Sequence, residues 1–229
     1  MIKLEKADVY GWEAAIRGMR NPMNSWDKSD TAYWVCPNPG DLYYGLGEND
    51  LKLMKSLSKA GDDHGKFLRF VNVTVDITAP LYWWKEFDTY KVGTVANSCS
   101  TMHKIAEKEF ELSDFSFDHL TEGSLEQVAM PLVSVLNGAR DAYLNFDKYN
   151  EEAPDGWDKG IACKKDVWWQ MIQLLPSSYN QKRTGQLNYQ VLKSMYFARR
   201  HHKLDEWRAF CEWCESLPYF KEICIDVYD

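Results

Sequence analysis

The sequence predicts an α+β protein, in the broad α/β class, that is mostly helical around a small β-sheet. One observation is the alternation of β-branched and polar residues at 71–78, which is typical of a strand with one buried face. A second is the helical spacing of apolar residues in several later segments. With 229 residues the chain can bury a core of its own, and we expect residues 1–229 to form a single domain.

The first predicted elements lie before residue 105. Leu51, Met54 and Leu57 share one helical face in segment 48–60, and Gly61 is a C-cap signal for that helix. The strand at 71–78 comes next. The aromatic helix 81–87 follows it, because a proline stands where a helix can begin. A loop is expected at 92–101.

The later part of the chain is predicted to be helical. A long helix is expected at 124–149, where Ser124 and Gln127 have the spacing of a capping box and Pro131 predicts a kink or a later start. Further helices are predicted at 158–175, 187–201 and 204–217. The turn-rich stretches 36–40 and 151–156 are candidate loops or domain boundaries.

Charge and composition restrict the classes of partner. The net charge of −7, from 34 acidic and 27 basic residues, disfavours polymeric nucleic acid, because such binders neutralise phosphates with basic side chains. No window approaches the ~18 apolar residues of a membrane span, and the N-terminal segment is charged where a secretory signal would be apolar. We therefore expect a cytoplasmic protein with no membrane partner. The aromatic content of 14% indicates a heavy core, a large subunit interface or a stacking site.

Six cysteines are present, and only Cys211 and Cys214 form a Cys-x-x-Cys pair. A structural zinc site needs a second pair, or histidines at ligand spacing, so we expect no metal site. The cysteines are interpreted as reduced thiols of a cytoplasmic protein.

One segment of this acidic chain is basic. Residues 181–208 hold seven Lys or Arg against two acidic residues. On the predicted helix, Gln190, Lys193 and Arg200 lie near one face, and Arg199 lies elsewhere. Guanidinium groups suit bidentate phosphate binding, so the segment is either an anion site or a solvated helix face.

Residues 91–101 are rich in small hydroxyl side chains, which together with backbone amides can hold phosphate oxygens. Within this loop, Cys99 is either a structural cysteine or a nucleophile activated by His103. The tryptophan pairs at 83–84 and 168–169 are either core residues or stacking groups for a flavin or a base.

The order of these segments resembles that of the flavin-dependent thymidylate synthases, whose signature RHRxxSxNxxSxR follows a strand and an Ala-Pro helix. With one inserted residue, the Ser, Asn and Ser of that signature fall on Thr94, Asn97 and Ser100. Lys91 falls on the last base of RHR. The first Arg, the His and the final Arg are replaced by Thr89, Tyr90 and Met102.

The resemblance also covers an upstream pattern and a downstream one. His64 matches the first His of the family's HxTPFEH pattern, in which Arg69 and Phe70 replace the Glu and the second His. Downstream, after a Leu-Pro pair at 175–176, the Asn of an Asn-x-Arg stretch falls on Asn188 and its Arg on Gln190. Arg199 resembles the late Arg that binds and polarises the pyrimidine, and the His after it falls on His202.

This resemblance implies a homotetramer with FAD and dUMP bound where subunits meet, and methylene-tetrahydrofolate as the methyl donor. It implies a catalytic role for Arg199. The implied nucleotide-binding residues are Lys91, Thr94, Asn97, Ser98, Ser100, Gln190 and Arg199. The implied cofactor-binding residues are His64, Arg69, Asn188 and His202.

Several cations of the family signature are uncharged here, and each loss weakens anion binding by about one to a few kcal/mol. The sequence therefore favours a divergent member with degraded flavin chemistry that binds a nucleotide for sensing or sequestration. One alternative is an active FAD-dependent thymidylate synthase of pyrimidine metabolism. Another is an oligomeric scaffold that binds no small molecule.

Overall fold

The structure is a computed structural model that describes residues 1–35, 42–152, 161 and 163–228. Internal contacts divide the chain into two compact units. The first unit comprises Met1, Thr78–Phe87 and Ser98–Arg183, and the second comprises Ile2–Ile77, Asp88–Asn97 and Thr184–Asp229. This division does not test whether residues 1–229 form the single domain that the sequence predicts, and that expectation stays a prediction. The turn-rich stretch 36–40, and 153–156 of the later one, lie outside the described residues.

The described strands are β1 (Lys3–Tyr10), β2 (Ala32–Val35), β3 (Leu42–Gly45), β4 (Asn72–Pro80), β5 (Val95–Ser98) and β6 (Asn180–Asn188). The described α-helices are α1 (Trp12–Arg20), α2 (Glu48–Lys59), α3 (Leu81–Phe87), α4 (Thr101–Lys104), α5 (Glu122–Ser124), α6 (Met130–Leu144), α7 (Phe146–Glu152), α8 (Lys164–Leu174), α9 (Tyr189–Arg199) and α10 (Asp205–Ser216). The predicted α+β class is confirmed. No helix among the described residues is long and apolar enough to cross a membrane.

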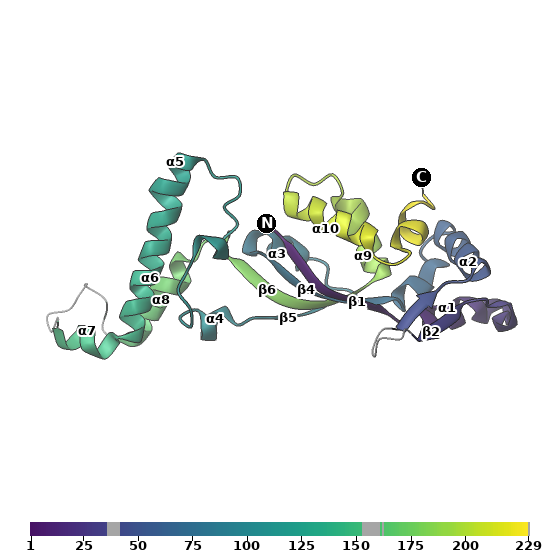
Figure 1. Ribbon diagram of the computed structural model, residues 1–229, viewed down its shortest axis with the longest axis horizontal. Helices are drawn as coiled ribbons and strands as arrows, with labels where there is room; N and C mark the ends of the chain where they lie inside the picture. The colour runs from purple at the N-terminus through teal and green to yellow at the C-terminus, as the bar shows by residue number, and fades with distance from the viewer. Residues whose placement is uncertain (36–41, 153–160, 162, 229) are drawn as a thin grey trace. The chain divides into compact units, whose positions relative to one another are not determined.

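A 4-stranded sheet with the order β1-β4-β6-β5 holds the second unit together, and β4 and β6 run on into residues of the first unit. In β4, Val73, Val75 and Ile77 are buried, while Asn72 and Thr74 on the other face are half-buried. The predicted strand with one buried face is therefore confirmed. In Figure 1, α9 and α10 lie over one side of β4 and β6. Strands β2 and β3 form a separate antiparallel pair.

Aromatic side chains fill the core of the second unit. The Trp12 ring meets Tyr189 edge-on at 5.5 Å and Tyr219 at 5.7 Å between centroids. Trp207 and Phe210 of α10 are fully buried, with their ring centroids 5.6 Å apart. T-shaped pairs of this kind are favoured by the aromatic quadrupole. The heavy aromatic core predicted from composition is thus found here.

The first unit has its own core, in which α6 packs against α8 (Figure 1). The apolar residues at its centre are Ile105, Phe110, Phe115, Leu136 and Met171. Asn137 of α6 ties the helix to the backbone of Phe110. Its side chain accepts from the N–H of Phe110 at 2.8 Å and donates to the carbonyl of Phe110 at 2.9 Å.

The long helix expected at 124–149 begins earlier and is broken. Thr121 is the N-cap, since its hydroxyl accepts from the backbone N–H of Ser124 at 3.3 Å, so the predicted capping box of Ser124 and Gln127 is wrong. A π-helical turn at Leu125–Ala129 follows, and α6 then starts with Pro131 in its first turn. Proline lacks a backbone N–H, and only a first turn tolerates that loss.

Other expectations need correction too. The predicted loop 92–101 contains the strand β5 and the start of the short helix α4. Strand β6 was not expected, because only Gly185 and Leu187 within it are buried and its other side chains are polar. This strand also moves the start of the helix predicted at 187 to Tyr189.

Candidate functional site

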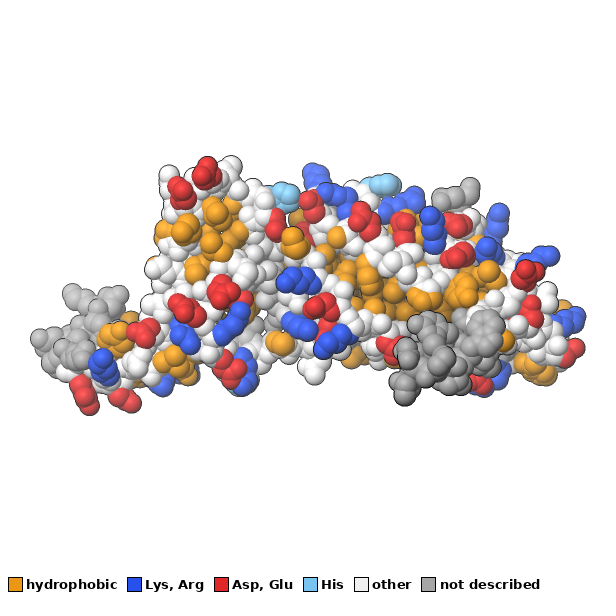
Figure 2. Space-filling model, viewed as in Figure 1, with side chains coloured by type: hydrophobic (Ala, Val, Ile, Leu, Met, Phe, Trp, Pro, Cys, Tyr) orange, Lys and Arg blue, Asp and Glu red, His pale blue; other side chains and the backbone are white. Residues whose placement is uncertain are grey.

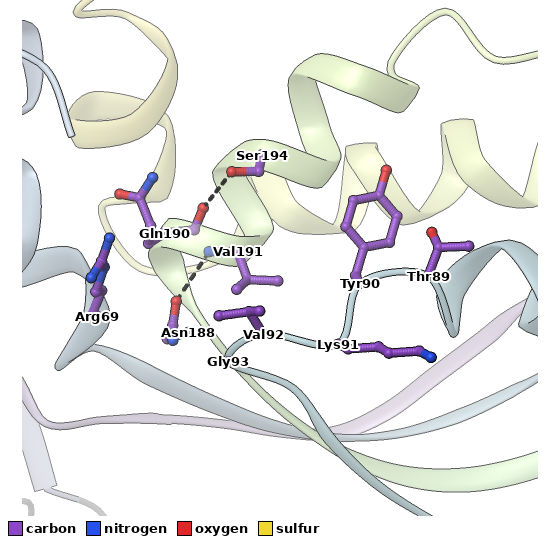
Figure 3. A pocket seen from close by; sticks show the side chains of 10 residues that line it. All are labelled: Arg69, Thr89, Tyr90, Lys91, Val92, Gly93, Asn188, Gln190, Val191 and Ser194. Atoms are coloured by element: carbon purple, nitrogen blue, oxygen red, sulfur yellow. Dashed lines mark hydrogen bonds between the residues drawn. The ribbon is translucent and has the colours of Figure 1, made fainter.

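A cavity of about 450 Å³ opens in the second unit at the start of α9. This volume lies within the range of ~300–1,000 Å³ that is usual for small-molecule sites. The cavity is bordered by the segment 89–93, by the first turns of α9, and by the end of the 3-10 helix Gly65–Arg69. The residues that line it are Arg69, Thr89, Tyr90, Lys91, Val92, Gly93, Asn188, Gln190, Val191 and Ser194 (Figure 3).

The segment 89–94 is folded tightly against α9. Gly93 has a φ of +79°, and a Cβ at this position would lie 2.9 Å from both Asn188 Nδ2 and Val191 Cγ2. Only glycine suits such a left-handed backbone in so close a contact. The hydroxyl of Thr94 donates to the carbonyl of Tyr90, and this hydrogen bond closes the turn. The turn brings Tyr90 to the cavity.

Asn188 ends β6 and caps α9. Its Oδ1 accepts from the backbone N–H of Val191 at 3.0 Å, which satisfies one of the unpaired amides at a helix start (Figure 3). The backbone N–H of Tyr189 donates to the carbonyl of Val71 at 2.9 Å, so the helix start is also tied to the segment before β4. The partial positive charge of a helix N-terminus favours an anionic ligand at this border of the cavity.

Two exposed cations line the same cavity. Figure 3 shows Arg69 beside Gln190 at one end, and Tyr90 and Lys91 at the other. The start of α9 lies between these ends, so positive charge borders the cavity at three places.

Gln190 connects the cavity to a buried lysine. A hydrogen bond from Lys193 Nζ to Asp62 Oδ1, at 2.7 Å, lowers the pKa of Asp62, and a hydrogen bond from Gln190 lowers it further. Because a carboxylate can only accept, Gln190 uses its Nε2 for this bond. Its Oε1 is buried, and in the part of the chain that the structure describes this oxygen has no hydrogen-bond partner. A water or a ligand donor is what such an acceptor requires.

Arg199 does not line the cavity but contacts a residue that does. Its Nε donates to the hydroxyl of Tyr90 at 3.0 Å. Its guanidinium carbon lies 4.9 Å from the ring centroid of Trp207 and 5.7 Å from that of Tyr90. The arginine therefore lies against two aromatic rings that contact each other, and cation–π attraction adds to the hydrogen bond.

Of the site residues predicted from the sequence, four line the cavity, namely Arg69, Lys91, Asn188 and Gln190. The others lie outside the cavity lining. Thr94 braces the turn, and Asn97 and Ser98 are exposed on β5. Ser100 caps α4, accepting from the backbone N–H of His103 at 3.2 Å.

The two histidines also lie outside the lining. His64 is exposed before the 3-10 helix Gly65–Arg69. His202 stabilises a turn, because its Nδ1 accepts from the backbone N–H of Leu204 at 3.2 Å. The ligand roles of all these residues stay predictions.

The basic segment 181–208 does not act as one patch. Lys193 is buried against Asp62, Arg183 stacks over Trp84 at 4.1 Å, and Arg200 lies 5.1 Å from the ring of Phe197. On the face seen in Figure 2, acidic and basic side chains alternate over the region of α9 and α10.

The cysteines of the Cys-x-x-Cys pair are buried thiols. Burial raises the pKa of Cys211 to about 11 and that of Cys214 well above its usual value, so both stay protonated at neutral pH. Among the described residues, no group of His, Cys, Asp or Glu could hold a metal ion. Cys99 is exposed. Trp83 and Trp84 are buried core residues, which is the first of the two interpretations offered for that pair.

Sequence reasoning missed several lining residues, among them Thr89, Tyr90, Val92 and Gly93. The glycine within a short Lys-Val-Gly turn was the available signal, since such a residue marks a positive φ or a close backbone approach.

Comparison with solved structures finds the same fold over nearly the whole chain. Thymidylate synthase X from Helicobacter pylori, solved with FAD and dUMP, has a TM-score of 0.64 at 17% identity, covering 99% of each chain. A flavin-dependent thymidylate synthase from the same organism, complexed with FAD and dUMP, has a TM-score of 0.62 at 18% identity, covering 97% of this chain and 99% of that one. No family model matches this sequence. No curated protein matches it either.

Proposed function

We propose that this chain, which has the fold of the flavin-dependent thymidylate synthases, binds a nucleotide in the cavity at the start of α9. The observation that carries the proposal is the cavity itself, which joins two cations and a helix N-terminus to an aromatic ring. A nucleotide offers the matching chemistry, because its phosphate is anionic and its base is planar.

Each lining residue has a role in this proposal. Lys91 and Arg69 attract the phosphate, and Asn188 holds the first turn of α9 toward it. Gln190 offers its unpaired Oε1 to a ligand donor. Arg199, which hydrogen-bonds the cavity residue Tyr90 through its Nε, is proposed as the catalytic or recognition residue for the pyrimidine. The family resemblance also gives nucleotide roles to Thr94, Asn97, Ser98 and Ser100, and these roles stay predictions because the four residues lie outside the cavity lining.

Some of the same residues would also determine whether the protein binds FAD. The family resemblance gives the cofactor to Arg69 and Asn188 at the cavity and to His64 and His202 outside its lining, and the charge of Arg69 suits the phosphates of either ligand. A bound flavin would supply redox chemistry. Because Gln190 and Tyr90 stand where the resembled family has an Arg and a His, we expect FAD to bind more weakly than dUMP. We therefore propose that the protein senses or sequesters a nucleotide in the cytoplasm, in preference to a catalytic role.

We also propose that the site lies at subunit interfaces of a homotetramer. Exposed apolar residues of the first unit support association between subunits, since Val128, Met130 and Val135 are 64%, 50% and 53% exposed. Unpartnered apolar side chains of this kind are commonly covered by another chain. Light scattering after gel filtration is expected to give a tetramer mass, and Val135→Asp is expected to reduce it. A monomer mass for the unmodified protein would end this part of the proposal.

Calorimetric titration with dUMP tests nucleotide binding. Lys91→Gln and Arg69→Gln are each expected to weaken dUMP binding about tenfold, the value of one charge-assisted hydrogen bond. Deoxyuridine, which lacks the phosphate, is expected to bind weakly to all variants alike. Lys66→Gln is the matched control, because Lys66 is exposed in the same 3-10 helix and does not line the cavity. Equal dUMP affinities in all variants would contradict the proposed site.

Two further measurements separate the alternatives. An active synthase would gain flavin absorbance on reconstitution with FAD, and would convert dUMP with reduced flavin and methylene-tetrahydrofolate. A binder would be stabilised by dUMP against thermal unfolding without that turnover, because a ligand selective for the folded state raises the Tm. A scaffold would show neither response.

A further inference from the structure

We infer that Tyr90 is a positioning residue that fixes the guanidinium of Arg199 for ligand recognition at the cavity. This rests on the proposed nucleotide binding, but it adds a residue that sequence reasoning did not select. Tyr90 lines the cavity and also contacts Arg199, and Arg199 does not line the cavity itself. Tyr90 is therefore the link between the arginine and the ligand space.

A hydrogen bond and a ring contact both act on the orientation of Arg199. The Nε–H is directed at the Tyr90 hydroxyl, 3.0 Å away, and the guanidinium carbon lies 4.9 Å from the Trp207 ring centroid. The guanidinium is planar, so fixing its Nε–H direction and its contact with a ring also fixes the positions of its two terminal nitrogens. Trp207 is fully buried and cannot shift easily.

Tyr90 is itself held in place. Its backbone carbonyl accepts from the Thr94 hydroxyl, and Gly93 packs the same turn against Asn188 and Val191 of α9. Its ring centroid lies 6.1 Å from that of Trp207, in an edge-to-face arrangement. The turn, the two rings and the arginine therefore form one continuous contact from the cavity to α10.

The consequence is preorganisation of Arg199. A free arginine loses rotamer freedom when it meets a ligand, and an arginine already fixed loses less. Tyr90→Phe removes the hydroxyl that accepts from Arg199 while the aromatic ring stays. Tyr90→Phe is thus expected to weaken dUMP binding about threefold to tenfold, which is the cost of ordering one long side chain.

A double-mutant cycle with dUMP titration tests the inference. The variants are Tyr90→Phe, Arg199→Gln and the double variant, with Tyr196→Phe as the matched control. Tyr196 also donates its hydroxyl, to Glu215 at 2.7 Å, but it does not line the cavity. If Tyr90 acts through Arg199, Tyr90→Phe weakens dUMP binding when Arg199 is present. In the Arg199→Gln background, Tyr90→Phe changes the affinity by less than about twofold, which is the uncertainty of a double-mutant cycle.

Equal effects of Tyr90→Phe in both backgrounds would overturn the inference, since Tyr90 would then contact the ligand without Arg199. An unchanged affinity in Tyr90→Phe would overturn it as well. If the unmodified protein binds no nucleotide, the proposed function fails instead. The positioning contact then has its own readout in the NMR signal of the Arg199 Nε–H. Slow exchange of this proton, lost in Tyr90→Phe and kept in Tyr196→Phe, supports the contact, and fast exchange in the unmodified protein refutes it.

Discussion

Arg20 and Asp50 form a buried ion pair in the second unit, with 2.7 Å between Arg20 Nε and Asp50 Oδ1 and side chains 5% and 0% exposed. The other carboxylate oxygen accepts from the hydroxyls of Ser29 and Thr31 at 2.7 and 2.6 Å. These three partners of Asp50 thus join α1, α2 and the segment between them.

Arg20→Met is expected to lower the free energy of unfolding by about 3–5 kcal/mol, because it leaves the carboxylate of Asp50 buried without its cation. Urea denaturation measures this loss. Arg17→Met is the control on the same helix, since Arg17 is exposed, and it is expected to stay within about 0.5 kcal/mol of the unmodified protein. Similar losses in the two variants would show that the pair is not the cause.

Asp50 gives stability a defined acid dependence. Burial alone would raise the pKa of Asp50, but hydrogen bonds from Thr31, Ser29 and Arg20, with the charge of Arg20, lower it below its usual value. Its contribution is therefore present above the unfolded pKa of about 3.9 and is lost as pH falls through the folded pKa. In Asp50→Asn, the unfolding free energy measured between pH 7 and pH 3 is expected to fall less steeply. An unchanged acid dependence would exclude Asp50 as its source.

The turn at Gly93 is expected to tolerate no larger residue. Gly93→Ala places a Cβ in a left-handed backbone against Asn188 and Val191, and is expected to cost about 1–3 kcal/mol of stability and to weaken dUMP binding. Gly138→Ala is the contrast, because Gly138 lies in α6 with nothing within 4 Å of the added Cβ. That variant is expected to gain up to about 1 kcal/mol from helix propensity. Equal unfolding midpoints of the two variants would contradict this account.

Cysteine reactivity is expected to divide the thiols into two groups. Brief iodoacetamide treatment of the native protein, followed by mass spectrometry of its peptides, is expected to label the exposed Cys99 and Cys163. Cys211 and Cys214 react only after unfolding, because burial keeps them protonated and covered. Early labelling of either buried thiol would show that α10 opens in the native state.

Local periodicity explains which elements the sequence predicted. The strand β4 and the helices α2, α9 and α10 carry their apolar residues at regular spacing, so each is visible without its partners. Strand β6 is different, because its polar residues form a strand only by pairing with β4 and β5 in the sheet. Such tertiary pairing leaves little periodic signal in a single sequence.

The candidate site divides in the same way. Lys91, Arg69, Asn188 and Gln190 were named from the family resemblance, and the fold brings them to one cavity. The role of Tyr90 depends on a contact with Arg199 across 109 residues, and spacing along the chain does not report such a contact. The basic segment 181–208 was a candidate anion site, but the structure pairs one of its cations, Lys193, with Asp62.

The close contact of Gly93 with Asn188 and Val191 has a consequence for the history of this chain. A Cβ at position 93 has no room while the other two side chains keep their size. Descendants and ancestors that share this turn are thus expected to keep glycine at 93, and to accept another residue there only where the left-handed backbone has also relaxed and 188 or 191 has become smaller. Correlated substitution at these positions would trace the turn through lineages whose overall sequences have diverged beyond recognition.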